Sequence, residues 1–183
     1  TIAALVREHD LRERREVESP ATEPFSLVSL EDRERLPADV EDAYPLSMMQ
    51  TAMLYHMEMT PDSRAYINVN SWHLRAPFDA EALREVMRQV VGRHAILRTS
   101  FDLTRYSKPL QLVHRHAEVP LEVNDLRHLS HDEQEEFIQE FLRELRRQMF
   151  DFSRPLQMYF YIHRRTDDSF QFSLAENHAI LDG

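Results

Sequence analysis

A histidine and an aspartate stand four residues apart near the end of the sequence, in the segment Asn177-His178-Ala-Ile-Leu-Asp182-Gly183. The residues before it alternate between apolar and polar side chains, which predicts a strand that ends close to this segment. A neutral imidazole at a strand end can accept a proton or hold the hydrogen of a nucleophile, and such catalysis typically contributes about 10²- to 10⁴-fold in rate. Spacing alone does not separate this role from a structural one, because the chain has ten histidines and a lone Asp182 is typical of a turn or a salt bridge.

Glycine is rare in this chain, and each glycine is therefore expected to be positional. Two occur in 183 residues, against an average usage of about 7%. Gly92 follows a helical pattern and is predicted to close that helix. Gly183 follows the aspartate, where a residue without a side chain permits a positive φ or the close approach of a substrate.

The composition limits the classes of function. Hydrophobic residues make up 42% of the chain, which is compatible with a globular core, and no apolar run reaches the length of a membrane span. We expect a cytoplasmic protein without a membrane partner. The absence of cysteine excludes disulfides, thiolate nucleophiles and cysteine-based metal sites, and we expect no metal. A net charge of -10 repels phosphate backbones, so nucleic acid is not an expected partner.

The chain divides into three parts. Residues 1–10 carry apolar side chains at helical spacing and are predicted to be the last helix of a preceding domain. Residues 11–24 mix both charges, contain Pro20 and Pro24 and have few apolar anchors, which is typical of an interdomain linker. Residues 25–183 carry the patterned segments and are predicted to form the folded domain.

Three helices are predicted in this domain. The first begins after Ser47, and its methionines are expected to fill the core as pliable side chains, the alternative being a surface that adapts to a ligand. The second begins after Asp79 and has apolar residues at i, i+3, i+4, i+7 and i+8. The third begins at a capping box formed by Ser130 and Glu133, and its apolar stripe ends at Met149.

Strands are predicted between and after these helices. Residues 66–75 alternate, and short extended segments are expected at 98–101, 110–113 and 119–123. Residues 158–163 and 170–174 alternate on either side of a turn, which predicts a hairpin that leads into the His178 segment. The chain is therefore expected to be an α+β domain without internal repeats.

Three separated segments together resemble the N-terminal half of the condensation domain of non-ribosomal peptide synthetases, a family similar in fold to chloramphenicol acetyltransferase. They are Tyr44-Pro-Leu-Ser47-Met-Met-Gln50-Thr-Ala-Met-Leu54, Arg93-His94-Ala-Ile-Leu97-Arg98-Thr-Ser-Phe101 and the His178 segment, and 150–156 is similar to the family's Phe-Asp, Pro-Leu segment. The resemblance implies an α/β sandwich in which helices pack on a mixed β-sheet. Residues 1–10 also resemble the last helix of a peptidyl carrier domain.

The resemblance implies amide bond formation between carrier-bound donor and acceptor aminoacyl thioesters. His178 matches the histidine that acts as general base or positions the attacking amine, and both roles stay open. Asp182 is expected to support the site through an ion pair with Arg98, and Gly183 to let the loop approach the thioester. The implied partners are an upstream donor and a downstream acceptor carrier domain, a second condensation lobe and an adenylation domain. No cofactor is expected in this lobe, because the substrates ride on the phosphopantetheine of the carriers.

Two residues depart from the family pattern: Asn177 stands where the family usually has a first histidine, and Met158 stands near a frequent arginine. Asn177 can still donate and accept hydrogen bonds in support of the site. The match covers one of the two lobes, so the chain alone is not expected to condense loaded carriers. The alternatives are a coenzyme-A-dependent acyltransferase, an epimerisation domain of the same superfamily, and a non-catalytic carrier-binding module.

Overall fold

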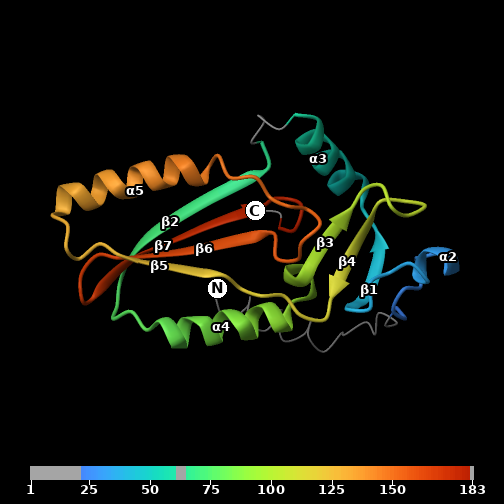
Figure 1. The fold of residues 1–183 in the computed structure, drawn as a ribbon, viewed down its shortest axis with the longest axis horizontal. Helices are drawn as coiled ribbons and strands as arrows, with labels where there is room; N and C mark the ends of the chain where they lie inside the picture. The colour runs from blue at the N-terminus through green and yellow to red at the C-terminus, as the bar shows by residue number, and fades with distance from the viewer. Residues whose placement is uncertain (1–21, 61–64, 182–183) are drawn as a thin grey trace, which may run out of the picture.

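The computed structural model describes residues 22–60 and 65–181 of the chain (Figure 1). The predicted helix at 1–10, most of the linker at 11–24, and both Asp182 and Gly183 lie outside the described residues. The elements follow in the order α2 (Leu30–Arg33), β1 (Val40–Pro45), α3 (Met48–Met59), β2 (Ile67–Arg75), α4 (Ala80–Arg93), the 3₁₀ helix η1 (Ala95–Arg98), β3 (Thr99–Asp102), β4 (Leu110–His114), β5 (Leu121–Asp125), α5 (His131–Leu145), β6 (Met158–Arg164) and β7 (Ser169–Asn177).

The strands form two sheets, whereas the sequence led us to expect one mixed sheet. The larger has the order β2-β7-β6-β5, in which β5 runs parallel to β6 and the other pairs are antiparallel. The smaller is antiparallel with the order β1-β4-β3. β4 pairs with β1 along one edge and with β3 along the other. Among the described residues neither β1 nor β3 pairs with a strand of the larger sheet, so these three strands form a separate sheet. The predicted α+β class is confirmed, and so is the hairpin of β6 and β7.

Two helices cover opposite faces of the four-stranded sheet (Figure 1). Alternate residues of β7 from Ser169 to Asn177 are buried, as a strand with period two requires. On this face α5 packs its apolar stripe against Ala175 and neighbouring tyrosines of β6. On the other face Val91 of α4 belongs to a core cluster that reaches Leu174. The sheet is thus sandwiched between helices, and its strand ends are free to carry a site.

The helix starts follow the predicted caps. Ser47 and Gln50 form a capping box at α3, Ser130 and Glu133 form another at α5, and Asp79 accepts two backbone N–H groups at α4. Gly92 does not end α4 as a left-handed residue, because the helix continues to Arg93 and no glycine of the described part has a positive φ.

The prediction for the methionines of α3 is mostly wrong. Met57 is buried, but Met48, Met49 and Met59 are 91%, 66% and 83% exposed. Leu54 and Met57 are the residues of α3 that are buried, because the helix lies at the edge of the structure beside the smaller sheet (Figure 1). No helix of the described residues is long and apolar enough to cross a membrane.

Candidate active site

The His178 segment forms a turn at the end of β7. This strand lies between the edge strand β2 and strand β6. The N–H of His178 donates to the carbonyl of Tyr66 at 2.8 Å, and the N–H of Ile180 closes the turn onto the carbonyl of Asn177 at 3.1 Å. Ala179 and Ile180 are buried in the core cluster that also contains Leu54. The turn is therefore fixed by backbone hydrogen bonds and by apolar packing, while His178 itself is half-buried.

One ring nitrogen of His178 has a partner on the neighbouring strand. Nδ1 lies 3.3 Å from Nδ2 of Asn68, and the same amide nitrogen lies 3.4 Å from Oε1 of Glu176. A carboxylate only accepts hydrogen bonds, so Glu176 orients the amide of Asn68 with its NH₂ group toward both neighbours. In a neutral imidazole this arrangement makes Nδ1 the acceptor and puts the proton on Nε2.

Sequence reasoning missed Asn68 because its part in the site depends on pairing between distant segments. Asn68 lies opposite Glu176 in the β2–β7 register, and residue 178 follows two positions later. The alternation of 66–75 predicted the strand but not its partner.

Asn177 lies at the base of the turn and is fully buried. Its Oδ1 accepts from the N–H of Ala179 at 3.0 Å, and its Nδ2 donates to Oε1 of Gln157 at 3.4 Å. Gln157 in turn donates to the carbonyls of Asp151 and Arg154 at 2.8 and 2.7 Å. Asn177 thus connects the turn to the segment before β6, and its predicted role as structural support of the site stays a prediction.

Arg98 is buried at the end of η1, with 8% of its surface exposed. Its guanidinium donates to Oε1 of Glu41 at 2.6 Å, to the carbonyl of Val91 at 3.2 Å and to the carbonyl of His114. Asp182 and Gly183 lie outside the described residues, so the ion pair expected between Asp182 and Arg98 stays a prediction. In the described part, Glu41 is the carboxylate that neutralises this arginine.

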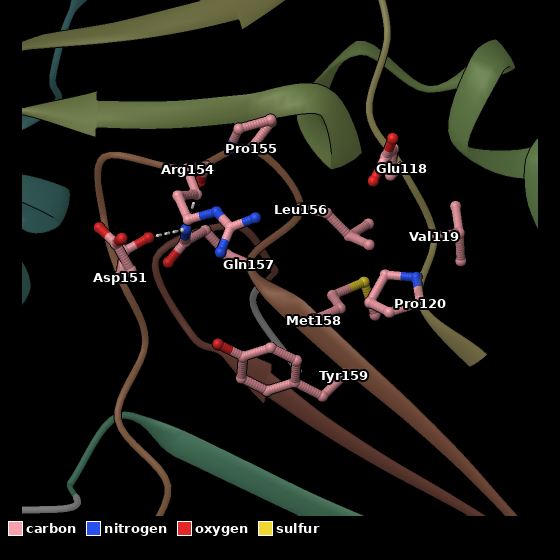
Figure 2. Close-up of a pocket in the computed structure, with 10 residues that line it drawn as sticks. All are labelled: Glu118, Val119, Pro120, Asp151, Arg154, Pro155, Leu156, Gln157, Met158 and Tyr159. Atoms are coloured by element: carbon pink, nitrogen blue, oxygen red, sulfur yellow. Dashed lines mark hydrogen bonds between the residues drawn. The ribbon is translucent and has the colours of Figure 1, made fainter. Parts of the chain in front are cut away.

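A pocket of about 430 Å³ opens beside the segment that Asn177 contacts. Figure 2 shows its lining residues, which come from the segment before β5, from the segment that leads into β6 and from the first two residues of β6. Leu156 at this pocket has a φ of 63°, in the left-handed region that a leucine rarely adopts. Gln157 lines the pocket and also contacts Asn177, whereas His178 is not among its lining residues.

A second constellation has the geometry of a serine nucleophile with its base. Oγ of Ser100 lies 2.7 Å from Nε2 of His114, and Nδ1 of His114 lies 2.8 Å from Oδ2 of Asp39. The hydrogen bond from His114 holds the pKa of Asp39 below its ordinary value. Ser100 is only 1% exposed, so a substrate carbonyl has no access to its hydroxyl. These contacts join β3 and β4 to the residue before β1. Among residues 22–60 and 65–181, no group of three histidine or acidic side chains is arranged to hold a metal ion.

The fold and the histidine turn define a class: an α+β lobe with a histidine at the end of a central strand. The family model described as Condensation domain matches residues 40–183. The chain belongs to this family, whose members in non-ribosomal peptide synthetases form amide bonds from carrier-bound substrates.

Relatives and solved structures agree with this assignment. The chain is 36% identical over 163 residues to the AMB antimetabolite synthetase AmbE of Pseudomonas aeruginosa, covering 88% of the chain and 8% of that relative. It is 31% identical over 144 residues to bacitracin synthase 1 of Bacillus licheniformis, covering 79% of the chain and 3% of the relative. The starter condensation domain of rhizomide synthetase RzmA superimposes with a TM-score of 0.69 at 17% identity, covering 78% of this chain and 35% of that one. The structural likeness supports the fold, and the chain spans a small part of its curated relatives.

Proposed function

We propose that this chain contributes the His178 half of a condensation site that joins a donor and an acceptor aminoacyl thioester. Both substrates would ride on the phosphopantetheine of carrier domains, one upstream and one downstream. A second lobe would complete the site, and an adenylation domain of the same protein would load the acceptor carrier. The observation that carries the proposal is the position of His178, whose Nδ1 faces Asn68 at 3.3 Å on a turn at the end of a central strand.

The reaction requires a group that stabilises the negative charge on the oxygen of the tetrahedral intermediate. The acceptor amine attacks the thioester carbon, a C–N bond forms and the carbonyl oxygen becomes an oxyanion. Collapse of the oxyanion breaks the C–S bond, and the thiolate of the donor arm leaves and takes up the proton lost from nitrogen. With Nδ1 of His178 accepting from Asn68, the Nε2–H group can donate a hydrogen bond to this oxyanion and keep its proton. The tautomer therefore favours a hydrogen-bond donor over a general base, which needs an unprotonated Nε2.

The test uses the intact parent synthetase with loaded carriers, and compares His178→Ala with His178→Gln. The glutamine amide keeps a donor but is not a base. A donor role predicts that His178→Gln retains at least about tenfold more product formation than His178→Ala, whereas a base role predicts equal losses of about 10²- to 10⁴-fold. The matched control is His116→Ala, a change at an exposed histidine, which should leave the rate at the parent value.

The same variants separate the remaining functions. Unchanged product formation by His178→Ala would contradict the proposal and favour a non-catalytic carrier-binding module. Acyl transfer from acyl coenzyme A to a hydroxyl acceptor would identify a coenzyme-A-dependent acyltransferase instead. Inversion of the α-carbon of a bound aminoacyl thioester would identify an epimerisation domain. The chain alone, mixed with loaded carriers, is expected to form no peptide product.

A further inference from the structure

Gln50 has two structural roles: it caps the start of α3 and it bonds to the histidine turn. Oγ of Ser47 accepts from the N–H of Gln50 at 3.1 Å, and Oε1 of Gln50 accepts from the N–H of Ser47 at 3.0 Å. These two bonds form a capping box, which satisfies two backbone donors at the helix start. Glutamate serves this purpose as well as glutamine does, so capping does not explain why the residue carries an amide.

The amide nitrogen of Gln50 contacts the histidine turn. Nε2 donates to the carbonyl of Ala179 at 3.1 Å, across 129 positions of the sequence, and lies 3.4 Å from Oε1 of Gln111. Ala179 follows His178 directly and is 6% exposed. A buried carbonyl without a partner is unfavourable, so this bond stabilises one particular conformation of the turn.

The two partners fix the orientation of the amide. The N–H of Ser47 needs an acceptor and the carbonyl of Ala179 needs a donor, and only one placement of oxygen and nitrogen satisfies both. The oxygen and the nitrogen of the Gln50 amide are therefore both hydrogen-bonded, and the side chain links the start of α3 to the turn.

We propose that Gln50 is a positioning residue for His178. It holds the carbonyl of Ala179, while the side chain of Asn177 holds the N–H of the same residue and Tyr66 accepts from His178. The bonds to Tyr66 and Asn177 restrain the two peptide units that flank the Cα of His178, and the Gln50 bond restrains the next unit, between Ala179 and Ile180. The three bonds together hold the turn that carries the imidazole in one conformation. The inference rests on the proposed function of His178, but the restraint on the turn can be measured without any activity.

Gln50→Glu separates the two roles, because a carboxylate keeps the capping acceptor and loses the donor. In this chain we expect the melting temperature to fall by no more than about 5 °C, because the carbonyl of Ala179 loses its donor. We also expect amide hydrogen exchange at Ala179 and Ile180 to be at least tenfold faster. In the parent synthetase we expect kcat to fall by about 10- to 100-fold with KM for the acceptor changed less than twofold, since a small misplacement of a catalytic group reduces the rate by this order.

The matched control is Glu133→Gln, which makes the reverse exchange at the same position of the capping box of α5 and should alter neither exchange at the turn nor kcat. If Gln50→Glu lowers the melting temperature by more than this, Gln50→Met decides. It keeps the length of the side chain but lacks both polar groups, and it must also lose kcat.

Unchanged exchange at Ala179 and Ile180, or a kcat within twofold of the parent in either variant, would overturn the inference. If His178→Ala retains full product formation but Gln50→Glu still accelerates hydrogen exchange at the turn, the proposed function is wrong. The restraint of the turn by Gln50 is then still confirmed.

Discussion

His163 is a buried ionisable side chain that catalysis does not use, and it should make the stability of this chain depend on pH. The side chain is 0% exposed in β6, and its ring lies 4.4 Å from that of Phe141 and 5.5 Å from that of Phe137. Neither ring nitrogen has a hydrogen-bond partner among the described residues. Burial lowers the pKa of His163 from 6.5 to about 4, against a small opposing effect of Glu122.

The sign and size follow from proton linkage. Between pH 6.5 and 4 the unfolded chain binds a proton at His163 that the folded chain excludes, so stability falls as the pH falls. The contribution of the neutral, buried His163 side chain to the free energy of unfolding is fully present above pH 6.5. At about 1.4 kcal/mol for each pKa unit, the loss reaches about 2 kcal/mol at pH 5 and about 3 kcal/mol at pH 4.

The assay is urea unfolding of this chain at pH 8, 7, 6, 5 and 4, followed by far-UV circular dichroism and by the fluorescence of Trp72. We compare the unsubstituted chain, called the parent here, with His163→Leu, which keeps a similar side-chain volume and cannot titrate. The control is His116→Asn, a change at an exposed histidine. The difference in unfolding free energy between His163→Leu and the parent should grow by about 2 kcal/mol from pH 8 to pH 5, and the control should follow the parent. A difference that stays constant over this range would refute the reasoning.

Two further predictions concern buried polar side chains. Arg98→Ala should reduce the free energy of unfolding by about 3 kcal/mol, because it leaves buried carbonyls and Glu41 without their donor; chemical denaturation measures this, and a loss below about 1 kcal/mol would contradict it. Asn177→Leu should destabilise the chain by about 1–3 kcal/mol, because the N–H of Ala179 and the amide of Gln157 lose their partner, and it should accelerate hydrogen exchange at Ala179; an unchanged exchange rate would show that the side chain does not hold the turn.

Much of the fold could be predicted because the deciding signals are local. The caps at Ser47, Asp79 and Ser130 fix where helices begin, since each side chain bonds a backbone N–H two or three residues away. The alternation in β6 and β7 predicted both strands, but it did not predict which side chains are buried. In β7 the polar Gln171 and Ser173 are buried whereas Phe170, Phe172 and Leu174 are half-buried, because helices cover both faces of the sheet. By contrast β1 escaped prediction, because its polar residues and Pro45 suit an edge strand whose pairing with β4 depends on a segment far away in the sequence.

The site divides in the same way. The sequence by itself determined the family, the identity of His178 as the candidate catalytic residue, and the strand that carries it, because motif residues and alternation are properties of short segments. Only the tertiary structure decided that Asn68 lies against Nδ1 of His178, that Gln50 donates to the carbonyl of Ala179, and that Arg98 donates to Glu41. These contacts join residues 57 to 129 positions apart. Such pairings depend on strand register and helix docking, which are set by the burial of the whole core and not by any single segment.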